Sequence, residues 1–332
     1  MQQSKKRFEL PKSSIRTLKN GKNLLAFSGG VDSSALFFIL HFNDITFDIA
    51  IVNYNTRENS KLEEEYAKEL AKEFQKKIFI KNVRLSPTNF EHTARKVRYE
   101  FFEKIIKEEN YTNLITAHQL DDKLEWFLMQ FTKGAGLSEI LGLSQITKKE
   151  GYTLVRPLLE YTKEDLLAYL KQNGIKYFVD ESNFSNKYKR NRFRKEFSAP
   201  LLKEYKEGIK KSFRYLQNDK NLLYKKPDIK RVKKLFIFDE YSEDLKNIRV
   251  IDELLKELGY VLSKSQRDEI IQKKDVVIAD SFAVVFANKK VYISPFVTIK
   301  MDKKFKESCR VKKIPPKIRG YILKEDILSE SL

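Results

Sequence analysis

Short apolar runs alternate with helix-spaced amphipathic patterns from Lys22 to about Gln130. The apolar runs predict strands at residues 24–27, 47–53, 77–83 and 114–116. The stretches between and after them predict helices at residues 33–41, 60–75, 91–109 and 121–130. Strands that alternate with helices form a parallel sheet with helices on both faces. We therefore predict an α/β fold whose ligands bind at the carboxyl ends of the strands.

The pattern changes further along the chain. A helix is predicted at residues 162–173, with Thr162 as N-cap and Gly174 just beyond its end. A basic helical stretch runs from 195 to 224, and residues 225–228 mark a boundary. Beyond it we predict helices at 249–259 and 265–273, and strands at 276–279, 283–288 and 290–293. The chain thus divides into an N-terminal domain (1–195), a helical linker region (196–226) and a small α+β C-terminal domain (227–332). Within the C-terminal domain, residues 314–319 fit a strand edge or a linker.

The charge balance narrows the class of partner. The 332 residues include 65 Lys and Arg against 46 Asp and Glu, a net charge of +19. Such an excess indicates a polyanionic partner, either a nucleic acid or an acidic membrane surface. A lysine-rich composition that merely keeps the protein soluble would explain the same net charge. The basic residues are spread over the N-terminal and C-terminal parts alike, as a large RNA footprint requires.

A single cysteine, Cys309, limits the chemistry. One cysteine forms neither an internal disulfide nor a cysteine-based metal or iron–sulfur site. The basic N-terminal segment is not followed by an apolar core, so we expect no secretion signal. No stretch is apolar over the ~18 residues that a membrane span needs. We expect a cytoplasmic protein with no membrane partner.

The segment Ser28-Gly29-Gly30-Val31-Asp32-Ser33 is the most informative in the chain. It follows a predicted strand and opens a predicted helix. Two glycines allow a sharp turn and close approach of a ligand, and the N–H groups of a helix start suit a phosphate. Asp32 would repel a phosphate, which indicates a bridging metal ion. The simpler interpretation is a strand–helix turn with an N-cap; a Walker-type loop is excluded, because the chain lacks G-x-x-x-x-G-K-[S/T].

This loop resembles that of the PP-loop ATP pyrophosphatases, and further motifs resemble the tRNA(Ile)-lysidine synthetases of that superfamily. The matching segments are Ile51-Val-Asn-Tyr-Asn-Thr-Arg57, Ala94-Arg-Lys-Val-Arg98-Tyr99, Thr116-Ala-His118-Gln-Leu-Asp121-Asp122-Lys-Leu-Glu125, Gly134-Ala-Gly136-Leu137, Arg156-Pro157-Leu158-Leu159, Asp180-Glu-Ser-Asn183 and Arg190-Asn191-Arg192-Phe193-Arg194. Tyr54 departs from the pattern, since the family usually has His there. Residues 259–266 also resemble the smaller substrate-contacting domain of some members.

The resemblance implies roles for individual residues. The loop would hold the β- and γ-phosphates of ATP, through Ser28, Gly29, Gly30, Val31, Asp32 and Ser33. Four residues would be catalytic: Asp32, Arg98, Asp122 and Arg194. Mg²⁺ would be held by Asp32 and Asp122, and the two arginines would stabilise charge that develops at the α-phosphate. Glu125 and His118 are weaker candidates. The plainer interpretations are a solvated helix face for the carboxylates, a structural histidine, and a surface ion pair for Arg98.

Six of the nine residues from Lys187 to Lys195 are basic, with Tyr188 and Phe193 among them. Cations that contact phosphates and rings that stack on bases are typical of RNA-binding segments. A solvated basic turn before a helix has the same composition. We predict RNA contacts at Arg190, Arg192 and Arg194.

The resemblance implies a ligase that joins free L-lysine to the first anticodon cytidine of tRNA(Ile) with a CAU anticodon, through an adenylated intermediate. Residues 1–195 would then be the PP-loop catalytic domain and residues 227–332 the tRNA-contacting domain. The sequence is compatible with a homodimer. Two alternatives stay open. A PP-loop tRNA thiolase is disfavoured by the single cysteine, and a catalytically silent RNA-binding protein is disfavoured by the intact loop.

Overall fold

The chain divides into two units, each built around its own β-sheet. The computed structural model describes residues 8–54, 59–85, 90–179, 189–223 and 227–327. Residues 1–220 form one unit and residues 221–332 the other. No helix in the described ranges combines the length and the apolar composition that crossing a lipid bilayer requires.

The N-terminal unit contains a six-stranded sheet in the order β3-β2-β1-β4-β6-β5. Its strands are β1 (Asn23–Phe27), β2 (Asp48–Asn53), β3 (Ile78–Asn82), β4 (Asn113–Ile115), β5 (Ile146–Lys149) and β6 (Tyr152–Val155). All neighbours pair in parallel except β5, which is antiparallel to β6. The predicted α/β fold is confirmed, and the β5–β6 hairpin is an addition that the sequence patterns did not predict.

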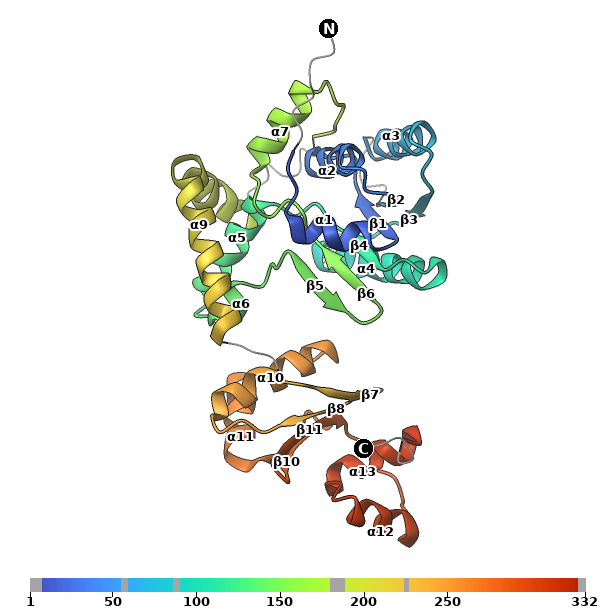
Figure 1. Ribbon diagram of the computed structural model, residues 1–332, viewed down its shortest axis with the longest axis vertical. Helices are drawn as coiled ribbons and strands as arrows, with labels where there is room; N and C mark the ends of the chain where they lie inside the picture. The colour runs from blue at the N-terminus through green and yellow to red at the C-terminus, as the bar shows by residue number, and fades with distance from the viewer. Residues whose placement is uncertain (1–7, 55–58, 86–89, 180–188, 224–226, 328–332) are drawn as a thin grey trace. The chain divides into compact units, whose positions relative to one another are not determined.

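Helices cover both faces of this sheet (Figure 1). Alternate side chains of β1 point to opposite faces, so Leu25 and Phe27 join one apolar cluster and Leu24 joins another. The helices that contribute to the first cluster are α1 (Lys12–Lys19), α2 (Val31–Phe42), α3 (Asn59–Glu73) and α7 (Lys163–Gln172). Helix α4 (Phe90–Glu109) packs on the second cluster through Phe102. The loops after the strands are thereby left free to form a site.

A separate apolar cluster joins three further helices: α5 (Leu120–Phe131), α6 (Leu137–Ile140) and α9 (Ala199–Leu223). Phe213 of α9 is buried and meets Phe127 of α5 edge-on, with ring centroids 5.5 Å apart. The Lys123 amino group lies 4.5 Å from the centre of the Phe213 ring.

Helix α9 accounts for most of the predicted helical region 196–226. The division between the two units falls at Lys220, within this helix. The predicted domain boundaries at 195 and 226 stay predictions.

The C-terminal unit is a three-layer arrangement around an antiparallel sheet in the order β7-β8-β11-β10-β9. Its strands are β7 (Lys230–Val232), β8 (Leu235–Asp239), β9 (Asp275–Ile278), β10 (Phe282–Ala287) and β11 (Lys290–Pro295). One face packs against α10 (Asp244–Glu257) and α11 (Lys264–Lys273), and the other against α12 (Lys303–Val311) and α13 (Pro316–Glu325). The predicted hairpin is present, with Asn288 and Lys289 at φ 53° and 58° in its turn.

Residues 314–319, for which we expected a strand edge or a linker, instead lead into helix α13. Pro316 stands in the first turn, where its missing N–H costs no helical hydrogen bond. Ile318 and Ile322 then join the apolar cluster on the sheet. The expectation was wrong because a Pro-Pro pair breaks the interior of a helix but is well tolerated at its start.

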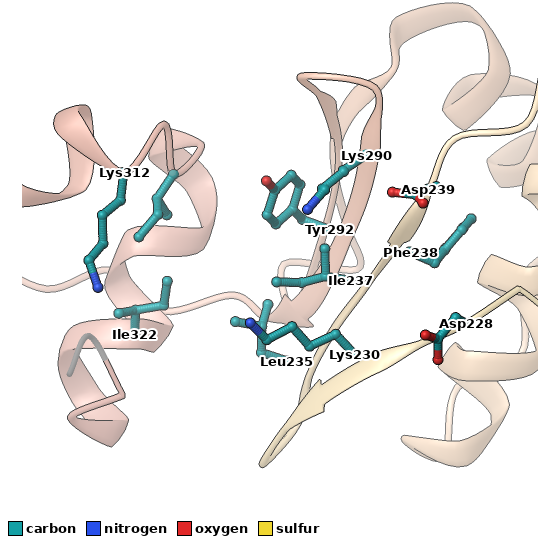
Figure 2. Close-up of a pocket in the computed structure, with 11 residues that line it drawn as sticks. Asp228, Lys230, Leu235, Ile237, Phe238, Asp239, Lys290, Tyr292, Lys312 and Ile322 are labelled. Atoms are coloured by element: carbon teal, nitrogen blue, oxygen red, sulfur yellow. The ribbon is translucent and has the colours of Figure 1, made fainter. Parts of the chain in front are cut away.

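A cavity of about 410 Å³ lies between this sheet and the C-terminal helices (Figure 2). Leu235 and Ile237 of β8 and Ile322 of α13 form apolar walls. Figure 2 shows Lys290 on the sheet side of the cavity and Lys312 on the helical side. The cavity therefore has apolar walls and charged groups of both signs, because Asp228 and Asp239 also line it.

Phe213→Ala is expected to lower the free energy of unfolding of the N-terminal unit by about 3–5 kcal/mol, because it leaves a cavity beneath α9. The matched control is Tyr215→Ala on the same helix. Its side chain is 58% exposed, and its loss should cost less than about 1 kcal/mol. Urea unfolding followed by circular dichroism measures both. Equal losses in the two variants would contradict the packing of α9 on α5.

Candidate active site

A cleft of about 840 Å³ opens at the carboxyl ends of the strands of the N-terminal unit. Residues of the loop after β1 line it, together with Arg98 of α4 and Asp122 in the first turn of α5. Arg190 of α8 (Lys189–Phe193) and Arg194, which opens a π-helical turn (Arg194–Ser198), complete it. The cleft thus occupies the sheet edge at which ligands bind in α/β folds of this kind.

The loop after β1 is shaped by its own backbone and hydroxyl groups. Gly29 has φ +72°, which side chains rarely allow. Ser33 Oγ lies 3.0 Å from Ser28 Oγ and donates to the Gly30 carbonyl at 3.2 Å. The first helical bond of α2 runs from Ser34 N–H to Gly30, and no side chain caps the helix. The N–H groups at this helix start are therefore available to an anion.

A second segment supports the loop from behind. The Phe178 N–H donates to the Gly29 carbonyl at 2.9 Å, and Phe178 forms a parallel bridge with Gly30. A Cβ on Gly29 would lie 3.4 Å from the Phe178 ring and from Glu63. Sequence patterns did not single out Phe178, because nothing local relates it to a loop so far away in the chain.

Asp32 is the carboxylate of the loop. Its pKa is raised to about 7, mainly by burial and next by the negative charge of Asp122, while the positive charges of Lys163 and Arg194 oppose the shift. Its Oδ1 atom is buried with no hydrogen-bond partner among the described residues. A buried acceptor without a donor fits a cation bound beside it.

The donor set of Asp32 and Asp122 fits Mg²⁺. In the described part of the chain, no group of three or more His, Cys, Asp or Glu side chains is arranged to hold a metal. Mg²⁺ commonly takes one or two protein carboxylates and completes its shell with substrate phosphates and water. The site thus agrees with a metal shared between the protein and a phosphate ligand, and not with a metal in an all-protein cage.

Glu125 holds the arginine segment against α5. Its side chain is 1% exposed and accepts from Nε of Arg190 at 2.8 Å and from Nε of Arg194 at 2.5 Å. Arg190 also pairs with Asp122, and Nη2 of Arg194 lies 3.7 Å from Asp122 Oδ1. Two carboxylates and two guanidinium groups neutralise one another here, which fixes both arginines at the wall of the cleft.

Capping interactions fix the start of α5. The Asp121 N–H donates to the Gln119 side chain at 2.5 Å, and the Gln119 N–H donates to Asp122 at 3.1 Å. The Asp121 carboxylate accepts from the Lys163 N–H at 3.0 Å, which ties α5 to the start of α7. Lys163 also lines the cleft, although no motif pointed to it; its place directly after the predicted N-cap was the available signal.

Three further residues line the cleft, each in a different environment: Arg98, Tyr54 and His118. Arg98 is exposed and forms no hydrogen bond or ion pair within the described ranges, so its charge is available to a ligand. Tyr54 donates to the Ala94 carbonyl at 2.9 Å. His118 shares a 2.9 Å hydrogen bond with Thr116, and burial lowers its pKa to about 4, which makes it neutral near pH 7.

Arg192 lies apart from these groups. It is exposed and pairs with Glu196 at 2.8 Å along the helix surface. Of the three arginines for which we predicted RNA contacts, the structure brings Arg190 and Arg194 together in the cleft and leaves Arg192 outside it. The predicted segments 180–183 and 187–188 lie outside the described residues.

Comparisons with known proteins agree with this geometry. A family model described as a PP-loop domain matches residues 2–201. The tRNA(Ile)-lysidine synthase of Campylobacter jejuni is 46% identical over 319 residues, which cover 96% of this chain and 97% of that protein. The proteins of the same name from Wolinella succinogenes and Helicobacter pylori are 47% and 43% identical, over 92% and 95% of this chain and 93% of each relative. The chain belongs to the tRNA(Ile)-lysidine synthase family.

Membership of the tRNA(Ile)-lysidine synthase family confirms the resemblance drawn from the loop and the motifs that follow it. It also favours that interpretation over a thiolase. The lysidine synthase relatives are matched along nearly their whole length, so the similarity includes the C-terminal unit as well as the PP-loop domain.

Glu125→Gln is expected to lower the free energy of unfolding by about 3 kcal/mol, because two guanidinium groups lose their buried counter-charge. This value is at the lower end of the cost of removing one partner of a buried ion pair, because Arg190 and Arg194 are 45% and 25% exposed. The control Glu196→Gln removes the exposed partner of Arg192 and should cost much less, because solvent screens this surface pair. Urea titrations compare the variants with the parent protein. A loss at Glu125 no larger than that at Glu196 would refute its anchoring role.

Proposed function

We propose that the protein joins free L-lysine to C2 of the cytidine at the first anticodon position of tRNA(Ile) with a CAU anticodon. ATP is consumed, and the products are lysidine in the RNA, AMP and pyrophosphate. One observation carries the proposal: the phosphate-binding loop, Arg98, Asp122 and Arg194 line a single cleft. The relatives named tRNA(Ile)-lysidine synthase support the choice of RNA and product.

ATP binding follows from the loop. The N–H groups at the start of α2 and the hydroxyls of Ser28 and Ser33 receive the β- and γ-phosphates. Mg²⁺, held by Asp32 and Asp122, would supply positive charge to the phosphate oxygens. Lys163 adds a further cation at the same wall of the cleft.

In the first step the C2 oxygen of the cytidine attacks the α-phosphorus, and pyrophosphate leaves. This step is needed because a carbonyl oxygen is a poor leaving group until it is adenylated. Arg98 and Arg194 stabilise the negative charge that develops on the α-phosphate. Glu125 keeps Arg194 in position for this, whereas Arg98 reaches the cleft from α4 without a partner in the described ranges.

In the second step the neutral ε-amine of lysine attacks C2, the C2–O bond breaks, and AMP leaves with the oxygen. A free lysine amine has a pKa of ~10.4, so the cleft must orient the ammonium group and remove its proton. The carboxylates that line the cleft, Asp32, Glu63 and Asp122, are the groups that can do this.

Lysine incorporation tests the proposed reaction. Purified protein is mixed with ATP, Mg²⁺, radiolabelled lysine and an unmodified tRNA(Ile) transcript with a CAU anticodon. Label should enter the RNA only when ATP is present, and replacement of the anticodon cytidine by uridine should abolish it. Formation of AMP without label in the RNA would retain adenylation but assign a different nucleophile. No turnover of any kind would favour the catalytically silent RNA-binding protein.

Asp32→Asn is expected to slow lysine incorporation by about 100-fold or more, because the loop loses the charge that helps to hold the metal and phosphates. Binding of the transcript should stay unchanged, since no cation is lost. The control Glu108→Gln removes an exposed carboxylate of α4 outside the cleft and should keep the parent rate. Incorporation by Asp32→Asn at the parent rate would exclude the loop as the ATP site.

A further inference from the structure

Arg156 carries a buried positive charge that no acidic side chain of the described residues balances. It directly follows β6, at the same sheet edge as the cleft, and is only 6% exposed. Its Nη1 donates to the Ser144 carbonyl at 2.8 Å and to the Thr147 hydroxyl at 3.1 Å, both of which are neutral. Its Nε is buried without a partner, and no ion pair reaches the guanidinium within the described ranges. A buried cation with neutral partners alone is costly for folding.

A second guanidinium lies near the first. Burial and the charge of Arg95 both lower the pKa of Arg156, whereas Tyr99 supports its charge. Arg95 is exposed on α4, with its Cζ 4.8 Å from the centre of the Tyr99 ring, and it makes no ion pair in the described part of the chain. Two cations therefore flank one phenol, and no carboxylate among the residues that the structure describes pairs with either of them.

This positive region borders the cleft. Tyr99 lines the cleft, and it stands one helical turn after Arg95 on the same face of α4. The charges of Arg156 and Arg95 also reach His118, where they act with burial to lower its pKa. The region is thus placed to bind an anionic group of a substrate whose reacting part lies in the cleft.

We propose that Arg95, Tyr99 and Arg156 bind a phosphodiester group of the substrate RNA, next to the cytidine that enters the cleft. This inference rests on the proposed function. The exposed Arg95 and the Tyr99 hydroxyl contact the phosphate oxygens directly, and the buried Arg156 adds its charge from beneath. Guanidinium groups suit phosphate because they offer several N–H donors in one plane.

The sheet order separates this site from the ATP phosphates. The phosphate-binding loop follows β1 and Arg156 follows β6, with β4 between them. Two strand spacings amount to about 10 Å. The other small anion in the reaction is the carboxylate of free lysine. An RNA phosphate is favoured over the lysine carboxylate for two reasons. An RNA strand brings a phosphate beside every base, and the exposed Arg95 is not among the residues that line the cleft.

Arg95→Gln tests the site without the risk to folding that a change at Arg156 brings. The matched control is Lys104→Gln, which removes an exposed cation from the same helix, where Lys104 pairs with Glu108 at 3.8 Å. Binding of a synthetic anticodon stem-loop is measured for the parent protein and both variants. Each loop phosphate is replaced in turn by an uncharged methylphosphonate, and the salt dependence of binding is recorded.

In the parent protein, one methylphosphonate position should weaken binding about tenfold. The Arg95→Gln variant should bind unmodified RNA about tenfold more weakly than the parent protein, and the salt slope of its binding should be lower by about one. The methylphosphonate at that same position should not weaken its binding further. Lys104→Gln should match the parent protein. The KM values for ATP and for lysine should not change in either variant.

Four results would overturn the site. If every methylphosphonate weakens binding by Arg95→Gln as much as it weakens binding by the parent protein, Arg95 contacts none of these phosphates. If the KM for lysine rises in Arg95→Gln, the cations bind the lysine carboxylate instead. A parent protein that neither binds the stem-loop nor modifies full-length tRNA(Ile) would refute the proposed function itself, and this site with it. A parent protein that modifies tRNA(Ile) normally while Arg95→Gln is indistinguishable from it would refute only the site.

Discussion

The buried carboxylate of Glu125 is the constraint on which the candidate active site depends. Burying a carboxylate so that it is 1% exposed is costly for folding unless cations pair with it. Arg190 and Arg194 supply them from a segment more than sixty residues further along the chain. The pairing folds that segment over the start of α5 and brings Arg194 within electrostatic reach of Asp32. One buried charge thus joins the phosphate-binding loop, α5 and the arginines into a single cleft.

Charges of both signs stay partly unbalanced in this cleft and beside it. Burial raises the pKa of Asp32 and of Asp121, and the charge of Asp122 adds to both shifts. Arg95 and Arg156, by contrast, have no acidic partner within the described ranges. Such arrangements are costly for folding and cluster at functional sites. Mg²⁺ with ATP would balance the acidic part, and a phosphodiester would balance the basic part.

Sequence alone predicted the elements and residues that local patterns encode. The strands and helices of the parallel sheet follow from apolar periodicity, and Thr162 caps α7 as predicted because capping depends on adjacent residues. The loop at residues 28–33 and Arg98 lie in contiguous motifs, so a family resemblance could locate them. The contact of Phe178 with Gly29 and the burial of Arg156 depend on segments distant in the chain. No local pattern reports such contacts.

The central claim is that this cleft adenylates the C2 oxygen of an RNA base, so that the oxygen leaves with AMP. The most direct measurement uses tRNA(Ile) in which the anticodon cytidine carries oxygen-18 at C2, and mass spectrometry of the AMP formed with ATP and lysine. We predict that AMP gains the heavy oxygen in proportion to lysine incorporated, because the C2–O bond breaks as the amine attacks. Unlabelled AMP, with lysine incorporated all the same, would contradict adenylation at this oxygen.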